Sequence, residues 1–180
     1  MVAVPIMSGI VADGADFRTA FPVNLVPVPK TTGLSEGYLR PADGIETLSD
    51  GGGANRGGYR WRGVHYRIMG NSLLSVAADG SHVTIGTIDG TDWATFDESF
   101  DYLAINGGGK LYLYDGATLA QVTDVDLGTS LDMVWINGYF VSTDGEFLIS
   151  SDINDPFSFN ILRYASSEIS PDPVVALQKV

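Results

Sequence analysis

The sequence predicts an all-β protein, and three observations support this fold class. The chain of 180 residues is rich in glycine and aromatic residues, with 22 Gly, 3 Trp, 8 Tyr and 8 Phe, a composition typical of short strands joined by tight turns. Short apolar and alternating runs dominate after about residue 56, without an amphipathic helix pattern. Dipeptides that tolerate positive φ separate these runs and predict hairpin turns. They are Asp79-Gly80, Asp89-Gly90, Asn106-Gly107, Asp115-Gly116, Asn137-Gly138 and Asp144-Gly145.

The first element is a proline-rich leader, which contains the stretch FPVNLVPVPKTTGLSEGYLRP from Phe21 to Pro41. Its prolines offer no N–H group to a helix interior or a central strand, so we expect an extended arm. Residues 1–56 are therefore predicted to form an arm that ends in a glycine-rich connector.

Residues 57–180 are predicted to form a second part, made of three units of short strands. Glycine pairs seven residues apart bracket one strand in each unit: Gly63 and Gly70, Gly109 and Gly116, Gly138 and Gly145. A second unit near 100–127 is shorter and less regular than the others. The strands of the first unit are expected near 58–63, 64–69, 72–77 and 82–88, and those of the third near 131–136, 139–143, 146–150 and 158–163.

Units of roughly 30–46 residues with about four short strands suit the blades of a β-propeller, in which small sheets bury their faces by stacking. The segment from Ser150 to Phe157 resembles the Asp-box turn of sialidase-type propellers, with Asn154 and Phe157 in place of Gly and Trp. We therefore expect a partial β-propeller-like array. Val174–Val180 reads as a further strand without a partner, which predicts a fragment of a longer protein or pairing elsewhere.

The charge is distributed unevenly along the chain. Residues 1–67 hold seven Lys/Arg and six Asp/Glu, a net charge of +1, whereas residues 68–180 hold three Lys/Arg and 16 Asp/Glu, a net charge of −13. Strong direct binding of nucleic acid is disfavoured, because phosphate contacts need cations that the acidic part lacks. Its acidity is expected to serve solubility, or to repel DNA phosphates or complement a basic partner.

Cysteine is absent, so neither a disulfide framework nor a thiolate metal site can form. The opening MVAVPIMSGIVADG lacks a basic n-region, and no run reaches the roughly 18 apolar residues that a membrane span needs. We expect a soluble, uncleaved protein that is stabilised by packing or oligomerisation.

The sequence contains no motif that predicts catalytic, cofactor-binding or metal-binding residues. The two histidines, His65 and His82, are not accompanied by a Gly-x-Ser-x-Gly nucleophile motif. The segment from Asp152 to Asp155 lacks the mid-loop glycine and the distal glutamate of an EF-hand, so a turn is the better interpretation. Several carboxylates have no spacing that predicts an acid/base pair. They are Asp97, Glu98, Asp101, Asp124 and Asp126.

Two neighbouring segments carry residue types that bind phosphates or bases in other proteins. The loop from Gly51 to Gly58 lacks the Lys-Ser/Thr pair of a P-loop and precedes no helix pattern, so we interpret it as a flexible connector. A cluster of basic and aromatic residues is able to stack on nucleotides, but is more typical of one exposed strand face at a protein contact. Its members are Arg56, Tyr59, Arg60, Trp61, Arg62, Tyr66 and Arg67.

Short pieces along the chain resemble a known family. The leader pieces are Phe17-Arg18, Pro22-Val23-Asn24-Leu25, Pro29-Lys30, Gly37-Tyr38-Leu39-Arg40 and Gly44-Ile45. Later pieces follow in the same order: Tyr66-Arg67 near Gly70, Asp144-Gly145, Arg163-Tyr164-Ala165 and Ser170-Pro171-Asp172. Together they resemble the tail-hub proteins of short-tailed phages, also called packaged-DNA stabilisation proteins, over nearly the whole chain. Family members are considerably longer than this chain.

This resemblance implies a structural virion protein of a phage or prophage, with a propeller-like fold and without enzymatic activity or cofactors. Such a protein would assemble as a hexameric ring, contact the portal adaptor and the tail needle, join the portal-adaptor assembly to the tail and help to retain packaged DNA. It would be made in the host cytoplasm and reside in the phage tail, without contact with a membrane. Its leader would run extended over the protein's own surface or a neighbour's, with Val23, Leu25, Val26 and Val28 buried as anchors. No functional residue is carried over, because the family offers no catalytic motif to map.

Two other function classes stay open at this point. A carbohydrate-binding β-propeller module is suggested by the Asp-box-like turn and by Trp61, Trp93 and Trp135. A hydrolase would show a deep pocket in which two buried carboxyls have perturbed pKa values. A virion role predicts instead a large apolar or arginine-and-aromatic surface, and loss of assembly when Val23 and Leu25 are replaced by Asp.

Overall fold

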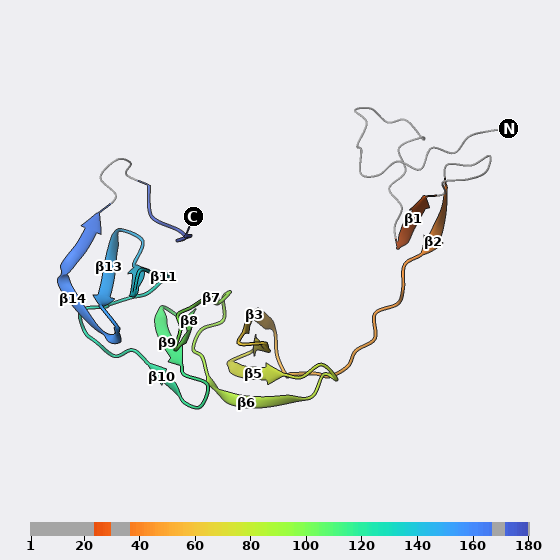
Figure 1. Cartoon of the computed structure of the whole chain (residues 1–180), viewed down its shortest axis with the longest axis horizontal. Helices are drawn as coiled ribbons and strands as arrows, with labels where there is room; N and C mark the ends of the chain where they lie inside the picture. Colours follow the sequence, from red (N-terminus) through yellow and green to blue (C-terminus); the bar gives the residue numbers. More distant parts are fainter. Residues whose placement is uncertain (1–23, 30–36, 167–171, 180) are drawn as a thin grey trace. The chain divides into compact units, whose positions relative to one another are not determined.

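The computed structural model describes residues 24–29, 37–166 and 172–179, which contain β-strands and no helix. This confirms the all-β fold class. The chain divides into two compact units, Met1–Thr47 and Leu48–Val180 (Figure 1).

The N-terminal unit contains one antiparallel hairpin, formed by β1 (Leu25–Pro29) and β2 (Gly37–Pro41). The Ala42 N–H donates to the Asn24 carbonyl over 2.8 Å, so the hydrogen-bonded pairs fall at even-numbered positions of β1. Pro27 and Pro29 fall at the odd-numbered positions, where the strand needs no N–H for its partner. The extended backbone expected for the leader is therefore confirmed for these strands, and their pairing with each other is an additional feature.

Apolar side chains of this hairpin remain open to solvent. The exposed fractions of Leu25 and Val26 are 38% and 39%, and that of Leu39 is 41%. Val28 is half-buried, and Val23 lies outside the described residues. The burial predicted for these anchors is thus not reached within the hairpin, and it stays a prediction about contact with another surface.

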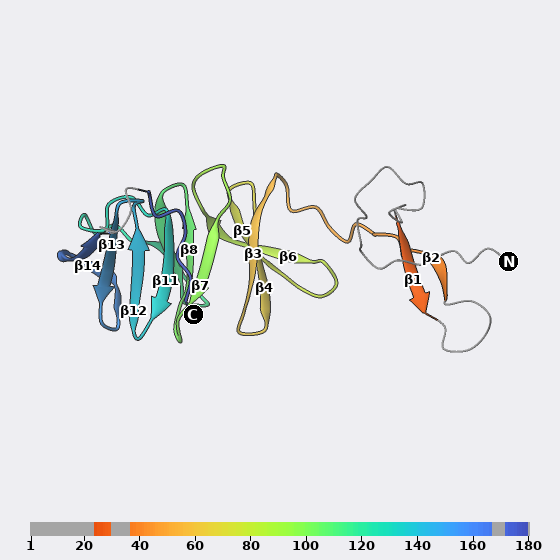
Figure 2. The same ribbon diagram turned by 90° about the horizontal axis from the view of Figure 1, so that it is seen from above.

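The C-terminal unit consists of three four-stranded antiparallel sheets, in which each strand pairs with the next along the chain. The three sheets follow one another in chain order, and β7 lies between β3 and β11 (Figures 1 and 2). This confirms the propeller-like array. The first sheet contains β3 (Asn55–Trp61), β4 (Val64–Met69), β5 (Ser72–Val76) and β6 (His82–Thr87). The second contains β7 (Thr95–Glu98), β8 (Leu103–Gly107), β9 (Lys110–Tyr114) and β10 (Leu119–Gln121). The third contains β11 (Asp132–Ile136), β12 (Tyr139–Thr143), β13 (Phe147–Asp152) and β14 (Asp155–Ser166).

The strand predictions are confirmed for the first and third sheets and partly wrong for the second. The second sheet begins at Thr95 rather than near residue 100, and its last strand ends at Gln121. The glycine pair of this sheet also brackets its third strand, whereas the other two pairs bracket second strands. The glycine spacing therefore aligns the first sheet with the third, but it does not align either of them with the second.

Two of the turn predictions are wrong. Asp89-Gly90 lies in the connector between the first two sheets, and Asn106-Gly107 ends β8. The Asn106 side chain is buried and donates to Ser130 Oγ, so it joins two segments of the core instead of forming a hairpin turn. Asn137-Gly138 does form a two-residue turn, with φ angles of 51° and 91°.

The second sheet packs on both of its neighbours. Leu103 and Ile105 of β8 belong to a cluster with the first sheet, and Ala104 belongs to a cluster with the third. All five residues of β8 are buried. Alternation of side chains along a strand places successive residues on opposite faces of the sheet, so one strand supplies two separate cores. The stacking of small sheets predicted from the sequence is thus present.

Candidate functional site

The histidines and carboxylates singled out in the sequence do not converge on one site. His65 and His82 are exposed on different strands of the first sheet. No group of three or more His, Cys, Asp or Glu in the described part of the chain is placed to hold a metal ion. Over the same residues, no helix has the length and apolar character of a membrane span.

Three of these carboxylates accept hydrogen bonds from the backbone of other segments. Asp97 is 7% exposed, accepts the Trp135 N–H at 2.6 Å and contacts Lys179 Nζ at 2.7 Å. Asp124 accepts the Phe159 N–H at 3.0 Å, which is the main reason that its pKa is lowered. Asp126 accepts the Ile161 N–H, two residues further along β14, at 3.4 Å. Each of these carboxylates therefore joins its own segment to a strand of the third sheet, and the three do not form a catalytic pair.

A groove beside the third sheet comes closest to the pocket expected of a hydrolase. Its volume is about 390 Å³, and Asp126 and Asp144 are among its lining residues. The pKa of Asp144 is lowered, mainly by the N–H of Phe147 and further by that of Glu146. Asp144 is therefore ionised at neutral pH and is unsuited to act as a general acid.

The basic and aromatic cluster is divided by the fold, so the prediction of one exposed strand face is wrong. Trp61 and Tyr66 are 2% and 6% exposed and lie in the core between the first two sheets. Arg60 and Arg67 are exposed. Side chains that alternate in the sequence point to opposite faces of the same hairpin, and this separates the aromatic residues from these arginines.

Arg56 takes a structural role that the sequence did not reveal. It is 2% exposed, and its guanidinium donates to the carbonyl oxygens of Asp92, Gly70, Ile88 and Asp89 at 2.6–3.0 Å. These carbonyls belong to a turn of the first sheet and to the connector that leads to the second. The connector predicted as Gly51–Gly58 is also partly ordered structure, because its last four residues belong to β3.

The tryptophans that suggested sugar binding lie in three different settings. Trp61 is buried in the core, and Trp93 is 75% exposed in the connector after the first sheet. Trp135 is half-buried on β11. The Asp-box-like turn is present between β13 and β14, where Asn154 adopts a positive φ of 59° at the position of the usual glycine. This turn is a structural element in this sheet.

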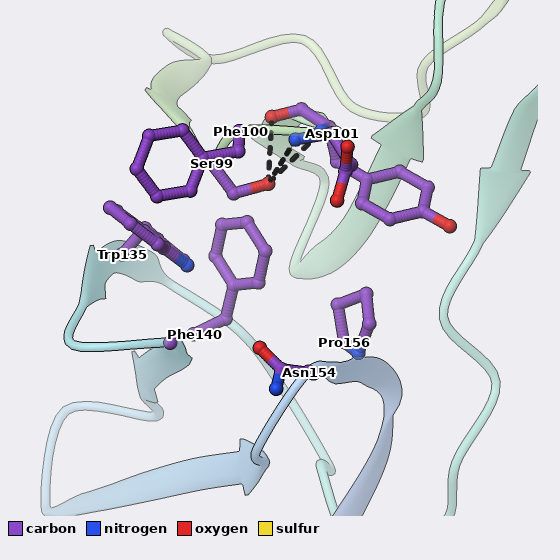
Figure 3. A pocket seen from close by; sticks show the side chains of 9 residues that line it. Ser99, Phe100, Asp101, Trp135, Phe140, Asn154 and Pro156 are labelled. Carbon is purple, nitrogen blue, oxygen red and sulfur yellow. Dashed lines mark hydrogen bonds between the residues drawn. The ribbon is translucent and has the colours of Figure 1, made fainter.

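The described surface does gather aromatic side chains at one end of the second and third sheets (Figure 3). The aromatic depression, as we call it, has a volume of about 70 Å³. Phe100 is 81% exposed, and its ring meets that of Trp135 edge to face, with centroids 5.2 Å apart. The lining residues are Ser99, Phe100, Asp101, Tyr102, Trp135, Gly138, Phe140, Asn154 and Pro156.

Local hydrogen bonds hold the loop that carries Phe100. Ser99 Oγ accepts the N–H of Tyr102 at 2.9 Å and that of Asp101 at 3.3 Å (Figure 3). Arg62 of the first sheet donates to the Phe100 carbonyl, and its guanidinium lies 4.4 Å from the ring centre of Trp61. The exposed phenyl ring is therefore presented on a fixed loop, since contacts from two sheets define the backbone beneath it.

The size of the aromatic depression limits what it can bind. Sites for small molecules usually measure roughly 300–1,000 Å³, so this depression has room for one side chain of a partner. Exposed aromatic residues with an adjacent arginine are enriched in protein interfaces. This surface could not be predicted from the sequence, because Phe100 and Trp135 are 35 positions apart in the chain.

Comparisons with known proteins agree with this architecture. The curated "Tail hub protein gp10" of Salmonella phage P22 is 26% identical over 193 aligned residues. The alignment covers 97% of this chain and 39% of the relative, so the chain spans well under half of that protein's length. A family model described as "Bacteriophage P22 Gp10, beta-propeller" matches residues 2–180. The chain therefore belongs to the P22 Gp10 β-propeller family, as the pieces of its sequence predicted.

Proposed function

We propose that this protein is a structural component of a phage tail, a hub-type protein that joins the portal-adaptor assembly to the tail and helps to retain packaged DNA. Its partners would be further copies of itself in a hexameric ring, the portal adaptor and the tail needle. The match of the family model over residues 2–180 carries this proposal. We assign it no enzymatic activity, and its place of action would be the virion after synthesis in the host cytoplasm.

The surface of the described residues supports a role in protein contacts. The aromatic depression offers an exposed phenyl ring on a braced loop, and the N-terminal hairpin offers exposed Leu25 and Val26. Both are the kinds of anchor that protein interfaces bury. The net charge of −13 on residues 68–180 favours a part of the tail that faces DNA without holding it, because like charges repel.

The proposal is tested in phage that carry a deletion of the gene or the Phe100→Asp substitution. Deletion is expected to yield capsids that package DNA and then lose it, measured as nuclease-sensitive DNA in purified particles. Phe100→Asp is expected to lower the infective titre by about tenfold or more, because a carboxylate replaces an interface anchor.

Val83→Asp is the matched control, since Val83 is 67% exposed on β6 of the first sheet. Thermal unfolding of both purified variants checks that they fold. Full titre and full DNA retention after deletion of the gene would overturn the proposed function. A normal titre with Phe100→Asp alone would instead remove only the aromatic depression from it.

A further inference from the structure

The lysine and arginine side chains of the described residues differ in whether they have an acceptor. Among residues 24–29, 37–166 and 172–179, six of these cations contact a carboxylate or a carbonyl oxygen. They are Arg40, Arg56, Arg62, Lys110, Arg163 and Lys179. The other two are Arg60 of β3 and Arg67 of β4, for which the same part of the chain supplies neither a hydrogen bond nor an ion pair.

The two unpaired arginines lie on the same face of the first sheet. Arg60 is directly opposite His65 of β4, and Arg67 follows His65 by two residues, so all three side chains point to one side. Trp61 and Tyr66 point to the other side, into the core with the second sheet. The basic face, as we call it, is exposed and consists of Arg60, His65, Arg67 and His82, the last in the same cross-strand row as Arg60.

A glycine brings the two arginine side chains beside each other. Gly58 of β3 is directly opposite Arg67, and a Cβ added at Gly58 would lie 3.3 Å from Arg67 Cγ and 3.6 Å from Arg67 Nε. The Arg67 side chain therefore lies across β3 at Gly58, two residues from Arg60 on the same side of that strand. Two residues along a strand span about 7 Å, so two cationic side chains meet solvent at about this spacing.

The surroundings of the basic face are cationic, although the chain as a whole is acidic. Residues 51–88 hold four arginines and both histidines, and Asp79 is the one acidic residue among them. Like charges on neighbouring strands repel each other and destabilise the sheet. An anion bound between Arg60 and Arg67 would relieve this repulsion, so the arrangement favours an anionic ligand.

We infer that the basic face binds an extended acidic segment of a partner protein, in which carboxylates occur at alternate positions. Alternate side chains of an extended segment point to one side and are about 7 Å apart. This spacing agrees with that of the two arginine side chains on β3. A guanidinium can hold a carboxylate by two parallel hydrogen bonds, which adds geometric specificity to the charge attraction. The proposed function assigns no role to this face.

Nucleic acid fits the basic face less well than an acidic polypeptide does. Trp61 and Tyr66 are 2% and 6% exposed, so they cannot stack on bases. A duplex longer than the face would bring further phosphates near a chain that carries a net charge of −13 over residues 68–180. A short acidic segment can pair with both arginines without this repulsion.

Fluorescence anisotropy of labelled peptides with the purified protein at low salt tests the inference. The first peptide alternates threonine and glutamate, and the second has the same composition with its glutamates in succession. The alternating peptide is expected to bind about fivefold or more tightly, because all its carboxylates share one side when it is extended. Arg60→Gln and Arg67→Gln should each weaken its binding about tenfold.

Arg163→Gln is the matched control, because it removes the same charge from an exposed arginine of the third sheet. It should change the affinity by less than about twofold, and thermal unfolding checks that all three variants fold. No binding of the alternating peptide, equal binding of both peptides, or equal losses from Arg60→Gln and Arg163→Gln would each overturn the inference.

A DNA duplex is the remaining probe. Tighter binding of the duplex than of the alternating peptide, with the same dependence on Arg60 and Arg67, would also overturn the inference, because the basic face would then bind phosphates. Weak duplex binding that is insensitive to both substitutions is the expected result. All these measurements use purified protein, so their outcome does not depend on the proposed function.

Discussion

The two junctions between the described sheets are built from opposite charges. At the junction of the first and second sheets, the buried guanidinium of Arg56 donates to four carbonyl groups. At the junction of the second and third, the buried carboxylate of Asp97 accepts a backbone N–H. A buried charge is tolerated when hydrogen bonds replace its lost water. Either sign can therefore fix the stacking of two sheets, provided that the backbone supplies the complementary groups.

The two junctions also differ in which segments supply the hydrogen-bond partners of the charged group. All the carbonyls around Arg56 belong to one turn and one connector, so the group is satisfied within neighbouring segments. Asp97 shares its oxygens between Trp135 of the next sheet and Lys179, which is 82 positions away in the chain. The first junction is therefore expected to lose more stability than the second when its charged side chain is removed.

The largest expected effect is that of Arg56→Met. The new side chain fills similar space but leaves four carbonyls, one buried and three partly buried, without their donor, so the free energy of unfolding should fall by about 4 kcal/mol. Urea denaturation measures the change. Arg60→Met, at an exposed position of the same strand, is the control and should stay within about 0.5 kcal/mol of the parent. Equal effects of the two substitutions would contradict the role given to Arg56.

Gly90→Ala should weaken the same junction almost as much. Gly90 has a φ of 94°, and an added Cβ would lie 2.6 Å from the backbone of Gly108 and 2.9 Å from Arg56 Nη2. The added Cβ would strain the backbone of residue 90 and push the Gly108 backbone away. Together these effects are expected to cost about 3 kcal/mol of unfolding free energy. Gly44→Ala has open space around its new Cβ and serves as the control. A Gly90→Ala protein with the parental midpoint in urea would show that the junction can relax.

Asp97→Ala tests the second junction and should cost about 2 kcal/mol of unfolding free energy, because the partly buried Trp135 N–H loses its acceptor. Asp97→Asn should cost less, since its amide oxygen can still accept that bond. The order of the three proteins in urea denaturation is the measurement. A loss for Asp97→Ala that equals the loss for Arg56→Met would contradict the comparison between the junctions.

The smallest expected effect comes from three carboxylates with lowered pKa values. Asp124 and Asp144 accept backbone N–H groups, and Asp89 pairs with Lys110 at 2.5 Å. The ordinary pKa is 3.8, and each of these folded values is lower. In the interval between the folded and ordinary values the unfolded chain binds more protons, so stability rises with pH there.

The free energy of unfolding should therefore be unchanged by these groups above about pH 5 and should fall as the pH drops through the lowered folded values. Denaturation midpoints between pH 7 and pH 3 measure this dependence. Asp124→Asn removes one titrating group, so the free energy of unfolding should fall slightly less steeply as the pH is lowered. An unchanged acid slope in this variant would show that the bond to Phe159 stabilises neutral and ionised forms equally.

The sequence was most informative where local rules decide the structure. Asn137-Gly138 predicted a hairpin turn because both residues tolerate positive φ, and the turn is present. The start of the second sheet was missed for the opposite reason. Asp97 interrupts the apolar pattern expected of a strand, and only the distant Trp135 and Lys179 explain why a carboxylate is buried there.

The surfaces were harder to predict than the strands. Arg56, Arg60 and Arg62 seemed to form one basic face, but the first is buried, the second is exposed and the third contacts the loop of Phe100. Alternation predicts that neighbours point to opposite sides, yet it does not say which side a later sheet will cover. The aromatic depression could not be found for the same reason, since its rings come from separate sheets.

The bonds from Asp124 and Asp126 to the N–H groups of β14 have a consequence for solubility at high protein concentration. β14 is the edge strand of its sheet, and unoccupied N–H groups at such an edge can recruit a strand from another molecule. Two carboxylates already fill these positions and add negative charge beside them. The chain is thereby protected from fibrillar growth along this edge.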